Sequence, residues 1–481
     1  MTNYETVMGI EVHVELSTNS KIFCGCSASY GDVANAHVCE GCAGMPGTLP
    51  SLNRRVIEYA VRAGLALNCE ISEFSRFDRK NYFYPDLPAA YQVTQMFHPI
   101  CKKGHLDIIA NGKVKTVGIN RIHIEEDAGK LVHDSWDDCA LVDYNRCSVP
   151  LIEIVSEPDF RAAEEVVAYL EKLKSTLQYL GVSDCKMQEG SMRADINISV
   201  RPAGTEKFGV RTEMKNMASL KSIARAIVGE AERHVDVIES GGKLYQETRR
   251  WDDNKNMSFA MRNKENAQDY KYFPDPNLMP VVIGEDYIRR VRETLPELQE
   301  EKRSRYIRAF ELPEYDADIL TGSKYLVDIF ERTVEICNNP KEASNWVMTE
   351  LLKLLNDAQM QPEDMKFNPD SLGEILKMIA EGKISRAIGK KTFAAVFESD
   401  ADPEEYIEKN GLSQVSDAGA IEPVLREVLD MNGKAVSEYL AGNEKNIQFL
   451  IGQSMKALRG KADPQTVREI LITLLNGRRE G

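Results

Sequence analysis

The chain has 481 residues, of which 43% are hydrophobic and 28% charged, and a formal net charge of −15. These values are typical of a soluble protein of roughly two to four domains, and the negative charge argues against broad electrostatic coating of nucleic acid. Mean hydropathy is −0.37. Because no apolar run of about 18 residues and no signal-peptide pattern is evident, we expect a cytoplasmic protein without a membrane span.

Up to about residue 290, short β-like runs alternate with Gly and Pro turns. The clearest runs cover 7–16, 119–129, 193–200 and 208–216. Apolar residues at helical spacing predict two helices, at 161–181 and 220–242, each ending at glycine. This region, 1–292, is predicted to be one α+β cradle domain built on a largely antiparallel sheet.

Beyond this region the pattern becomes helical. Apolar residues recur at three- and four-residue intervals over 325–357, with a break at Pro340, and again over 370–398 and 403–430. We therefore predict an all-α domain over 293–404 and a small helical tail domain over 405–481. The last part of the tail, 443–481, is locally basic within an acidic chain.

Four cysteines form two close pairs near the N-terminus: Cys24, Cys26, Cys39 and Cys42. Four thiolates at this spacing can close a tetrahedral Zn²⁺ site, which would be structural because it leaves no open position. His37 is an alternative ligand. The other interpretation is that the cysteines are free or buried thiols that fall into pairs by chance.

In four of the β-like runs, polar residues alternate with apolar ones, so that a strand would carry the polar set on one face. The sets are Glu11, His13 and Glu15; Arg121, His123 and Glu125; Arg193, Asp195, Asn197 and Ser199; Arg211, Glu213 and Lys215. One such strand is usually just half-solvated. Four in one sheet would gather carboxylates for Mg²⁺ and cations for phosphate. Since neither a P-loop nor a GxGxxG motif is evident, any ATP site would be of this acidic-sheet type.

Longer motifs occur along the chain: GIEVHVEL, CAGMPGTLPSLN, FDRKNYFYPDLP, IHIEEDAGK, VPLIEIVSEPD, MQEGSMRADINISVRP, RTEMKN, ESGGKLYQETRRWD, DYKYFPDPNL and, near the C-terminus, GQSMKALRGKADP. With the cysteine pairs, they resemble the GatB family, the B subunits of aspartyl/glutamyl-tRNA(Asn/Gln) amidotransferases. The resemblance implies a heterotrimer with an amidase (the A subunit) and a small C subunit. It also implies ATP-dependent phosphorylation of Glu or Asp mischarged on tRNA, followed by amidation with ammonia from the amidase.

The resemblance also suggests roles for individual residues. It implies Mg²⁺ ligands at Glu11, His13, Glu125 and Glu213, with Asp195 as a further catalytic candidate; His13 would act through water or by orienting a carboxylate. Phosphate or acceptor-end contacts are expected from Lys80, Tyr82 and Tyr84, unless these form a core strand. Nucleotide contacts are expected from Gln188, Glu189, Ser191 and Arg193, with turn chemistry as the alternative for Ser191. Charge neutralisation is expected from Arg211 and Lys215, unless they lie on a solvated strand face.

Several positions depart from the family pattern. Ala89-Ala90 stands where Lys-Gly is usual, Cys147-Ser148 where Ala-Gly is typical, Ala194 where Cys is common, and Gln268 where His is usual. Because the acids of the metal site remain, an active enzyme is favoured. The alternative is a divergent paralogue that binds tRNA as a scaffold with altered or lost activity. A metal-dependent hydrolase acting alone is disfavoured. Since no amidase or glutaminase signature is evident, glutamine hydrolysis is expected on another chain.

Overall fold

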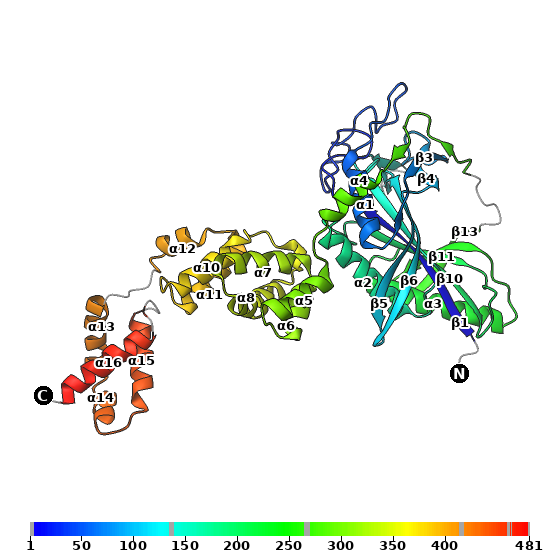
Figure 1. Cartoon of the computed structure of the whole chain (residues 1–481). Helices are drawn as coiled ribbons and strands as arrows, with labels where there is room; N and C mark the ends of the chain where they lie inside the picture. Colours follow the sequence, from blue (N-terminus) through cyan, green and yellow to red (C-terminus); the bar gives the residue numbers. More distant parts are fainter. Residues whose placement is uncertain are drawn as a thin grey trace. The chain divides into compact units, whose positions relative to one another are not determined.

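A computed structural model describes residues 4–133, 139–263, 270–412, 418–458, 462 and 464–479. It is a mixed α+β structure that divides into two compact units, Met1–Leu298 and Gln299–Gly481 (Figure 1). Within these described ranges, no helix combines the length and apolar character needed to cross a membrane.

The first unit is built on a nine-stranded sheet with the order β13-β12-β11-β10-β1-β9-β6-β5-β2. All of its described pairings are antiparallel except β11–β12. The strands are β1 (Tyr4–Glu15), β2 (Glu70–Ile71), β5 (Cys101–Ala110), β6 (Lys113–Glu126), β9 (Pro150–Ser156), β10 (Met192–Pro202), β11 (Thr212–Lys215), β12 (Glu247–Asp252) and β13 (Met257–Asn263). The strands predicted from alternation are all present and belong to this one sheet.

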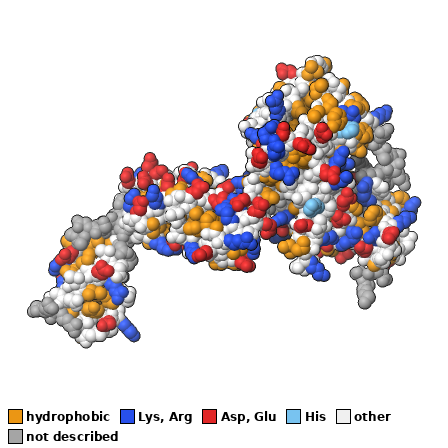
Figure 2. Space-filling view, in the orientation of Figure 1, with side chains coloured by type: hydrophobic (Ala, Val, Ile, Leu, Met, Phe, Trp, Pro, Cys, Tyr) orange, Lys and Arg blue, Asp and Glu red, His pale blue; other side chains and the backbone are white. Residues whose placement is uncertain are grey.

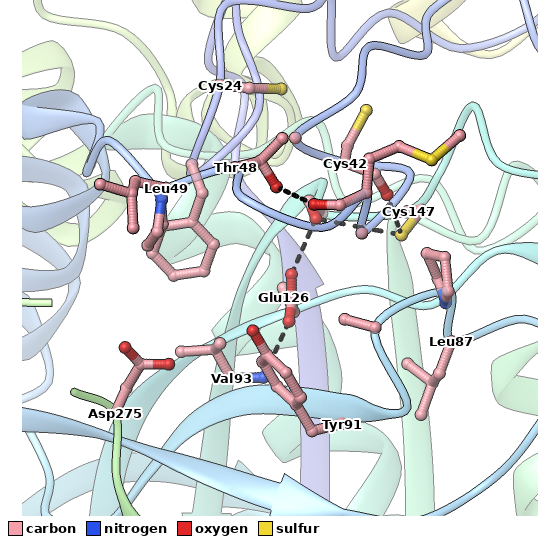
Figure 3. Close-up of a pocket in the computed structure, with 18 residues that line it drawn as sticks. Cys24, Cys42, Thr48, Leu49, Leu87, Tyr91, Val93, Glu126, Cys147 and Asp275 are labelled. Atoms are coloured by element: carbon pink, nitrogen blue, oxygen red, sulfur yellow. Dashed lines mark hydrogen bonds between the residues drawn. The ribbon is translucent and has the colours of Figure 1, made fainter. Parts of the chain in front are cut away.

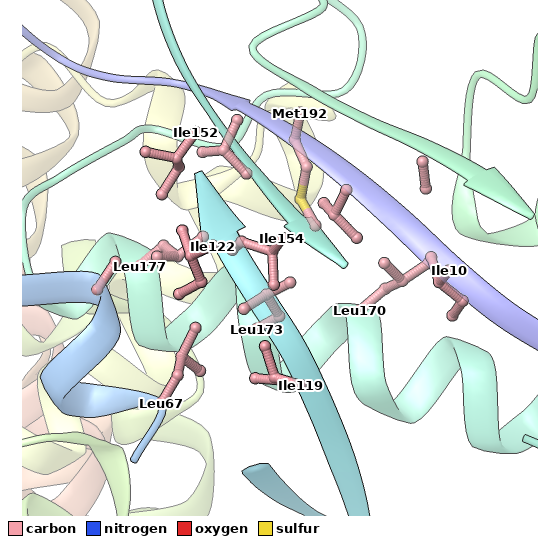
Figure 4. Packing of buried hydrophobic residues seen from close by; sticks show 14 of the residues in the cluster. Ile10, Leu67, Ile119, Ile122, Ile152, Ile154, Leu170, Leu173, Leu177 and Met192 are labelled. Carbon is pink, nitrogen blue, oxygen red and sulfur yellow. The ribbon is translucent and has the colours of Figure 1, made fainter. Parts of the chain in front are cut away.

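The apolar face of this sheet is buried under two helices, α2 (Ala163–Tyr179) and α3 (Leu220–Glu239). Figure 4 shows Ile122 and Ile154 of the sheet packed against Leu173 and Leu177 of α2. Both helices match the predicted positions. Because strand side chains alternate, burying this face turns the polar residues of the same strands toward the opposite side.

Smaller elements complete the first unit. A four-stranded sheet has the order β14-β3-β15, with β4 paired to β3, and a hairpin pairs β7 with β8. Their bounds are β3 (Phe74–Asn81), β4 (Tyr91–His98), β7 (Lys130–His133), β8 (Ala140–Asp143), β14 (Phe273–Pro274) and β15 (Val281–Val282). Two further helices, α1 (Arg54–Ala66) and α4 (Glu285–Glu293), pack against each other.

The second unit is entirely helical among its described residues and contains two separate apolar clusters. The first forms between α5 (Gln299–Ala309), α6 (Glu314–Thr321), α7 (Lys324–Cys337), α8 (Pro340–Trp346), η2 (Val347–Leu351), α9 (Leu352–Ala358), α10 (Asp370–Ala380), α11 (Arg386–Ser399) and α12 (Pro403–Lys409). The short η3 (Pro362–Asp364) follows α9 and has no buried residue. The second involves α13 (Ala418–Met431), α14 (Gly433–Leu440), α15 (Asn446–Ala457) and α16 (Pro464–Arg479). The predicted break at Pro340 is the start of α8, since proline fits the first turn of a helix.

Candidate active site

The polar faces of β11, β10, β1, β9 and β6 form one continuous surface. Glu11 lies opposite Asp195, and His13 lies opposite Glu153. On the other edge of β9, the same Glu153 lies opposite His123. Periodicity alone left open whether these strands were neighbours; the sheet order makes them so. The side chains on this surface divide into two clusters.

The first, the histidine–carboxylate cluster, consists of His13, His123, Glu125 and Glu153. The Nε2 atom of His13 lies 3.4 Å from Glu125 Oε1 and 3.3 Å from Glu153 Oε2, and His123 Nε2 lies 3.3 Å from the same Glu153 oxygen. Burial opposes the charge on Glu153, but the two imidazoles outweigh it and hold the pKa of Glu153 well below its ordinary range. Burial lowers the pKa of His123, but Glu153 and Glu125 raise it to about 9.

The second, the three-carboxylate cluster, consists of Glu11, Asp195 and Glu213, whose oxygens lie within 4.8 Å of one another. The Asn197 amide donates to Glu11 Oε1 at 2.9 Å. The Lys215 ammonium donates to Asp195 and lies 2.9 Å from Glu213 Oε1. Burial, followed by repulsion from Glu153 and Glu213, raises the pKa of Glu11 above its ordinary value. The expected Mg²⁺ ligands are therefore distributed over both clusters, with Glu11 and Glu213 here and His13 and Glu125 in the first.

The two clusters offer different donors to a metal ion. The three-carboxylate cluster presents only oxygen, the ligand type that suits Mg²⁺. The histidine–carboxylate cluster adds imidazole nitrogen, which transition metals such as Mn²⁺ accept more readily than Mg²⁺ does. Both donor sets are therefore suited to divalent cations.

A cavity of about 660 Å³ borders the three-carboxylate cluster. Its lining includes five of the expected site residues: Gln188, Glu189, Arg193, Asp195 and Lys215. Arg193 Nη2 donates to Asp127 Oδ2 at 2.7 Å. Burial and the nearby Asp127 raise the pKa of Glu15, which also lines the cavity, to about 8. The cavity thus combines fixed cations with acidic groups, an arrangement suited to a phosphorylated ligand and its metal.

Two of the expected residues lie in other surroundings. Ser191 Oγ donates to Asp184 Oδ1 at 2.5 Å and accepts from the Lys186 backbone N–H at 2.7 Å, so its hydroxyl holds the turn before β10. Turn chemistry was the alternative considered for this residue. Ser191 lines a neighbouring cavity of about 380 Å³ together with Glu15. Arg211 is exposed immediately before β11.

The expected acceptor-end residues come from the end of β3 and the segment after it. Lys80 Nζ lies 5.5 Å from the centre of the Tyr82 ring and 5.0 Å from that of Tyr270, and it lies 3.4 Å from Gln92 Oε1. The Tyr82 and Tyr270 rings meet edge to face at 5.7 Å. Tyr82 is thus part of an aromatic cluster, whereas Tyr84 is 57% exposed. An exposed ring of this kind is available to stack on a base.

The four paired cysteines converge, with their sulfur atoms within 4.8 Å of one another. Lys21, which is fully buried, lies 3.6 Å from Cys42 Sγ through its Nζ atom and donates to the carbonyl oxygens of His37 at 2.7 Å and Tyr144 at 3.1 Å. The His37 ring instead pairs with Asp32 at 2.9 Å. The cysteines, rather than His37, therefore form the cluster.

A cavity of about 170 Å³ lies beside the cysteine cluster (Figure 3). Three positions that depart from the family pattern line it: Ala89, Cys147 and Ser148. In Figure 3 the Glu126 side chain points into this cavity, where its carboxylate accepts from the Val93 backbone N–H at 2.8 Å and from Ser148 Oγ at 2.7 Å. Burial raises the pKa of Glu126 to about 7.

The backbone explains part of the family pattern at the departing positions. Ala90 has a φ of 61° and Ser148 a φ of 62°, and glycine is usual at both. The left-handed region is easy for glycine and strained for residues with a Cβ atom. Ala194 is buried on the helix-covered face of β10. Gln268 lies outside the described residues.

Three residues of the site were given no role from the sequence: Glu153, His123 and Tyr270. Glu153 is the one acidic residue between Ile152 and Ile154 in an apolar run. This position could have indicated a functional residue, because a charged residue within a buried strand is uncommon. His123 shares the polar face of β6 with Glu125, so its position also followed from alternation.

Basic and acidic side chains are mixed on the face of the molecule that Figure 2 shows. On the face shown in Figure 2, Lys and Arg side chains are interspersed with Asp and Glu over both units. In the last helices, basic residues also pair with acidic ones: Arg478 lies 2.5 Å from Asp430, and Arg426 contacts Glu422 at the same distance.

Comparison with known proteins identifies the family. Residues 6–289 match the family model described as the GatB/GatE catalytic domain, and residues 328–475 match the one described as the GatB domain. Relatives named as the B subunit of aspartyl/glutamyl-tRNA(Asn/Gln) amidotransferase include the protein of Lachnoclostridium phytofermentans, 57% identical over 99% of this chain and 100% of the relative. The protein of Agathobacter rectalis is 54% identical over the same shares, and that of Caldicellulosiruptor bescii is 51% identical over 97% of this chain and 98% of its own length.

The first unit is thus a catalytic domain of the GatB/GatE type. The chain belongs to the GatB family, the B subunits of aspartyl/glutamyl-tRNA(Asn/Gln) amidotransferases.

Proposed function

We propose that this chain is the B subunit of a glutamine-dependent tRNA amidotransferase, an ATP-dependent carbon–nitrogen ligase. It phosphorylates the side-chain carboxylate of Glu-tRNA(Gln), Asp-tRNA(Asn) or both, and ammonia then converts the product to the amide. The observation that carries the proposal is the pair of metal-type clusters on one sheet face, beside a cavity that contains Arg193 and Lys215.

The chemistry requires this kind of site. A free carboxylate is a poor acyl donor because its leaving group would be oxide. Attack of a carboxylate oxygen on the γ-phosphorus of ATP forms an acyl phosphate and releases ADP. Ammonia then adds to the carbonyl carbon, inorganic phosphate leaves, and the amide remains. The first step accumulates negative charge, so it needs fixed cations around the phosphoryl group.

Each part of the surface has a role in this scheme. The three-carboxylate cluster and the histidine–carboxylate cluster would hold divalent cations, which supply charge neutralisation and orient the phosphates. Arg193 is held by Asp127 at the cavity wall, where its guanidinium can contact phosphate oxygens. Gln188, Glu189 and Lys215 line the same cavity as nucleotide contacts. Lys80, Tyr82 and Tyr84 would receive the acceptor end of the tRNA.

The four cysteines would hold a structural Zn²⁺. Their sulfur atoms converge within 4.8 Å, and buried Lys21 places a positive charge beside a group of thiolates that would otherwise be strongly negative. Such a site would stabilise the segment from Cys24 to Cys42, which has little regular secondary structure of its own.

The partners follow from the division of labour. An amidase, the A subunit, would release ammonia from glutamine, and a small C subunit would complete the heterotrimer. Several relatives carry the name of the B subunit of such an enzyme. The isolated chain should therefore show little hydrolysis of glutamine.

We further propose three domains with boundaries at 1–292, 293–404 and 405–481, the last of which contacts the tRNA body. The separate apolar clusters of the second unit support a division between its helices. Ending the chain at Leu412 would leave α12 in place and remove α13–α16. The truncated protein should bind tRNA more weakly while its affinity for ATP stays the same; unchanged tRNA affinity would exclude this role for the tail.

The decisive experiment assembles the chain with its A and C subunits and supplies ATP, glutamine and either Glu-tRNA(Gln) or Asp-tRNA(Asn). ADP release and amide formation are followed together. The proposal predicts both products with at least one tRNA. If tRNA binds but no ADP appears with either substrate, the chain is a non-catalytic scaffold that binds tRNA. This is the alternative suggested by the departures from the family pattern at Ala89 and Ala90.

A further inference from the structure

The two cysteine pairs are joined by an intercysteine loop, residues 27–38, which consists of turns and irregular backbone. The loop follows Cys26 and precedes Cys39, two of the four cysteines whose sulfur atoms converge within 4.8 Å of one another. Most of its residues are exposed, including Tyr30 at 69% and Val33 at 77%. Because the loop buries little apolar surface, polar contacts must hold it in place between its two ends.

Asn35 joins this loop to the end of β8. Its side-chain Nδ2 donates to the Val142 carbonyl oxygen at 3.0 Å, and its Oδ1 accepts from the Tyr144 backbone N–H at 2.8 Å. The backbone N–H of Asn35 donates to Asp143 Oδ1 at 3.0 Å. Asn35 has a φ of 60°, a conformation that asparagine tolerates better than most residues with a Cβ atom. This one loop residue is therefore bonded to each of three consecutive residues at the end of β8.

Asn145 makes the reverse connection, from the residues after β8 to the loop. Its Nδ2 donates to the Val33 carbonyl oxygen at 2.7 Å, and its Oδ1 accepts from the His37 backbone N–H at 2.8 Å. Loop backbone thus engages both polar atoms of this amide. We call the side chains of Asn35 and Asn145 the amide clamp. Their hydrogen bonds join residues that are 107 to 112 positions apart in the sequence.

Both segments that the clamp joins line the cavity of about 660 Å³, which the proposed function assigns to the nucleotide. The loop contributes residues 28–32 to the lining. The end of β8 and the residues after it contribute Asp143, Asn145 and Arg146. The shape of this cavity therefore depends on the position of an exposed loop, and the position of the loop depends on the amide clamp.

Tyr30 is the one aromatic residue among the described residues that line this cavity. An aromatic ring can stack on the base of a nucleotide, a contact that does not involve the phosphates. Arg193 and Lys215, which also line the cavity, suit the phosphates instead. The loop can therefore add affinity for the nucleoside part of the ligand as long as the clamp keeps Tyr30 at the cavity wall.

We propose that the amide clamp positions the intercysteine loop as the wall that contacts the nucleoside part of ATP, with Tyr30 stacked on the base. Asn35 and Asn145 are then positioning residues that act through the loop, and Asn35 lies outside the described lining of the cavity. This inference rests on the proposed function and adds to it the part of the ligand that the metal-type clusters do not hold. The cysteine cluster contributes to the same role, since it fixes the two ends of the loop.

Calorimetric titration of the full-length chain with two ligands, in the presence of Mg²⁺, tests the proposal. A non-hydrolysable ATP analogue carries the base and the phosphates, whereas inorganic tripolyphosphate carries phosphates alone. Asn35→Ala and Tyr30→Leu should each weaken binding of the analogue by about tenfold or more, and each should leave the affinity for tripolyphosphate within about twofold of the wild type. General damage to the fold would weaken both ligands, so the selective loss identifies the role of the loop.

Asn111→Ala is the matched control, because Asn111 is an exposed asparagine in the turn between β5 and β6 with a similar φ of 51°. It should bind both ligands as the wild type does, and Asn145→Ala should behave like Asn35→Ala. If Asn35→Ala or Tyr30→Leu binds the analogue as tightly as the wild type, or loses both ligands equally, the proposal is overturned and the proposed function stands. Failure of the wild-type protein to bind the analogue would overturn both.

Discussion

Ser148 donates a hydrogen bond of 2.7 Å to Glu126, a buried carboxyl group that also accepts from the Val93 backbone N–H. The same cavity is lined by Ala89, where the family usually has a lysine. In this chain, therefore, the Ser148 hydroxyl and the Val93 backbone amide stabilise Glu126, whereas family members usually have a lysine at position 89 of the same cavity. These donors offset part of the cost of burying the carboxylate, but burial dominates and raises its pKa to about 7.

Replacing Glu126 with Gln should change the pH dependence of stability. The pKa of Glu126 rises from 4.5 to about 7 on folding, so the native protein binds a proton more tightly than the unfolded chain between these pH values. The wild type therefore loses stability from this group as pH rises through that window. Urea unfolding at pH 5 and pH 8 should show that the unfolding free energy of Glu126→Gln, relative to that of the wild type, increases with pH. The increase over this range should be on the order of 3 kcal/mol. A constant difference at both pH values would contradict this account.

Glu153 should be as important as the carboxylates expected from the sequence. It contacts both His13 and His123, so Glu153→Gln removes the anion that two imidazoles share. In the assembled enzyme we expect ADP formation to fall by more than about 100-fold, with tRNA affinity unchanged. Glu164→Gln, an exposed position on α2, is the matched control. Normal turnover of Glu153→Gln would remove Glu153 from the metal site.

Lys21 should be needed for metal retention by the cysteines. Lys21→Met keeps the apolar part of the side chain but removes the charge 3.6 Å from Cys42 Sγ and two hydrogen bonds to backbone carbonyls. Zinc release to a chromogenic chelator should become roughly 10- to 100-fold more favourable. Lys207→Met, at an exposed position, should retain zinc as the wild type does. Equal retention by both variants would show that Lys21 has no part in holding the metal.

Ala90→Gly should stabilise the protein. Ala90 has a φ of 61°, a conformation that glycine adopts without the steric cost of a Cβ atom. Glycine also gains flexibility in the unfolded chain, so the net increase in unfolding free energy should be about 0.5–1 kcal/mol. Ser148→Gly is an informative contrast, because it relieves a similar φ but loses the hydrogen bond to Glu126. Chemical denaturation of both variants would separate backbone strain from the hydrogen bond; a loss of stability in Ala90→Gly is the contrary result.

Alternation was sufficient to predict which residues of β1, β6, β10 and β11 share a polar face, because a strand leaves little choice once its apolar residues are buried. It could not predict strand order. The division of Glu11 and His13 between two clusters depends on β9 lying on one side of β1 and β10 on the other. Long-range pairing of this kind is not encoded in local periodicity.

Other parts of the site depended on contacts between distant segments. The approach of Tyr270 to Lys80 joins residues 190 positions apart, and no local pattern indicates it. For Ser191, the sequence suggested both a ligand and a turn residue, and the hydrogen bonds to Asp184 and Lys186 occupy its hydroxyl within the turn. A serine beside a glycine turn can either contact a ligand or stabilise the turn, and its hydrogen bonds are needed to distinguish the two roles.

Glu125 and Glu126 are consecutive residues at the end of β6, yet Glu125 belongs to the histidine–carboxylate cluster and Glu126 to the cavity beside the cysteines. A single peptide unit therefore joins the histidine–carboxylate cluster to the cavity beside the cysteines, two sites with different chemistry. Any rotation of this peptide that improves the geometry around one carboxylate displaces the other. A change in backbone geometry at one of these two residues would therefore also move the carboxylate of the other, without movement of a domain.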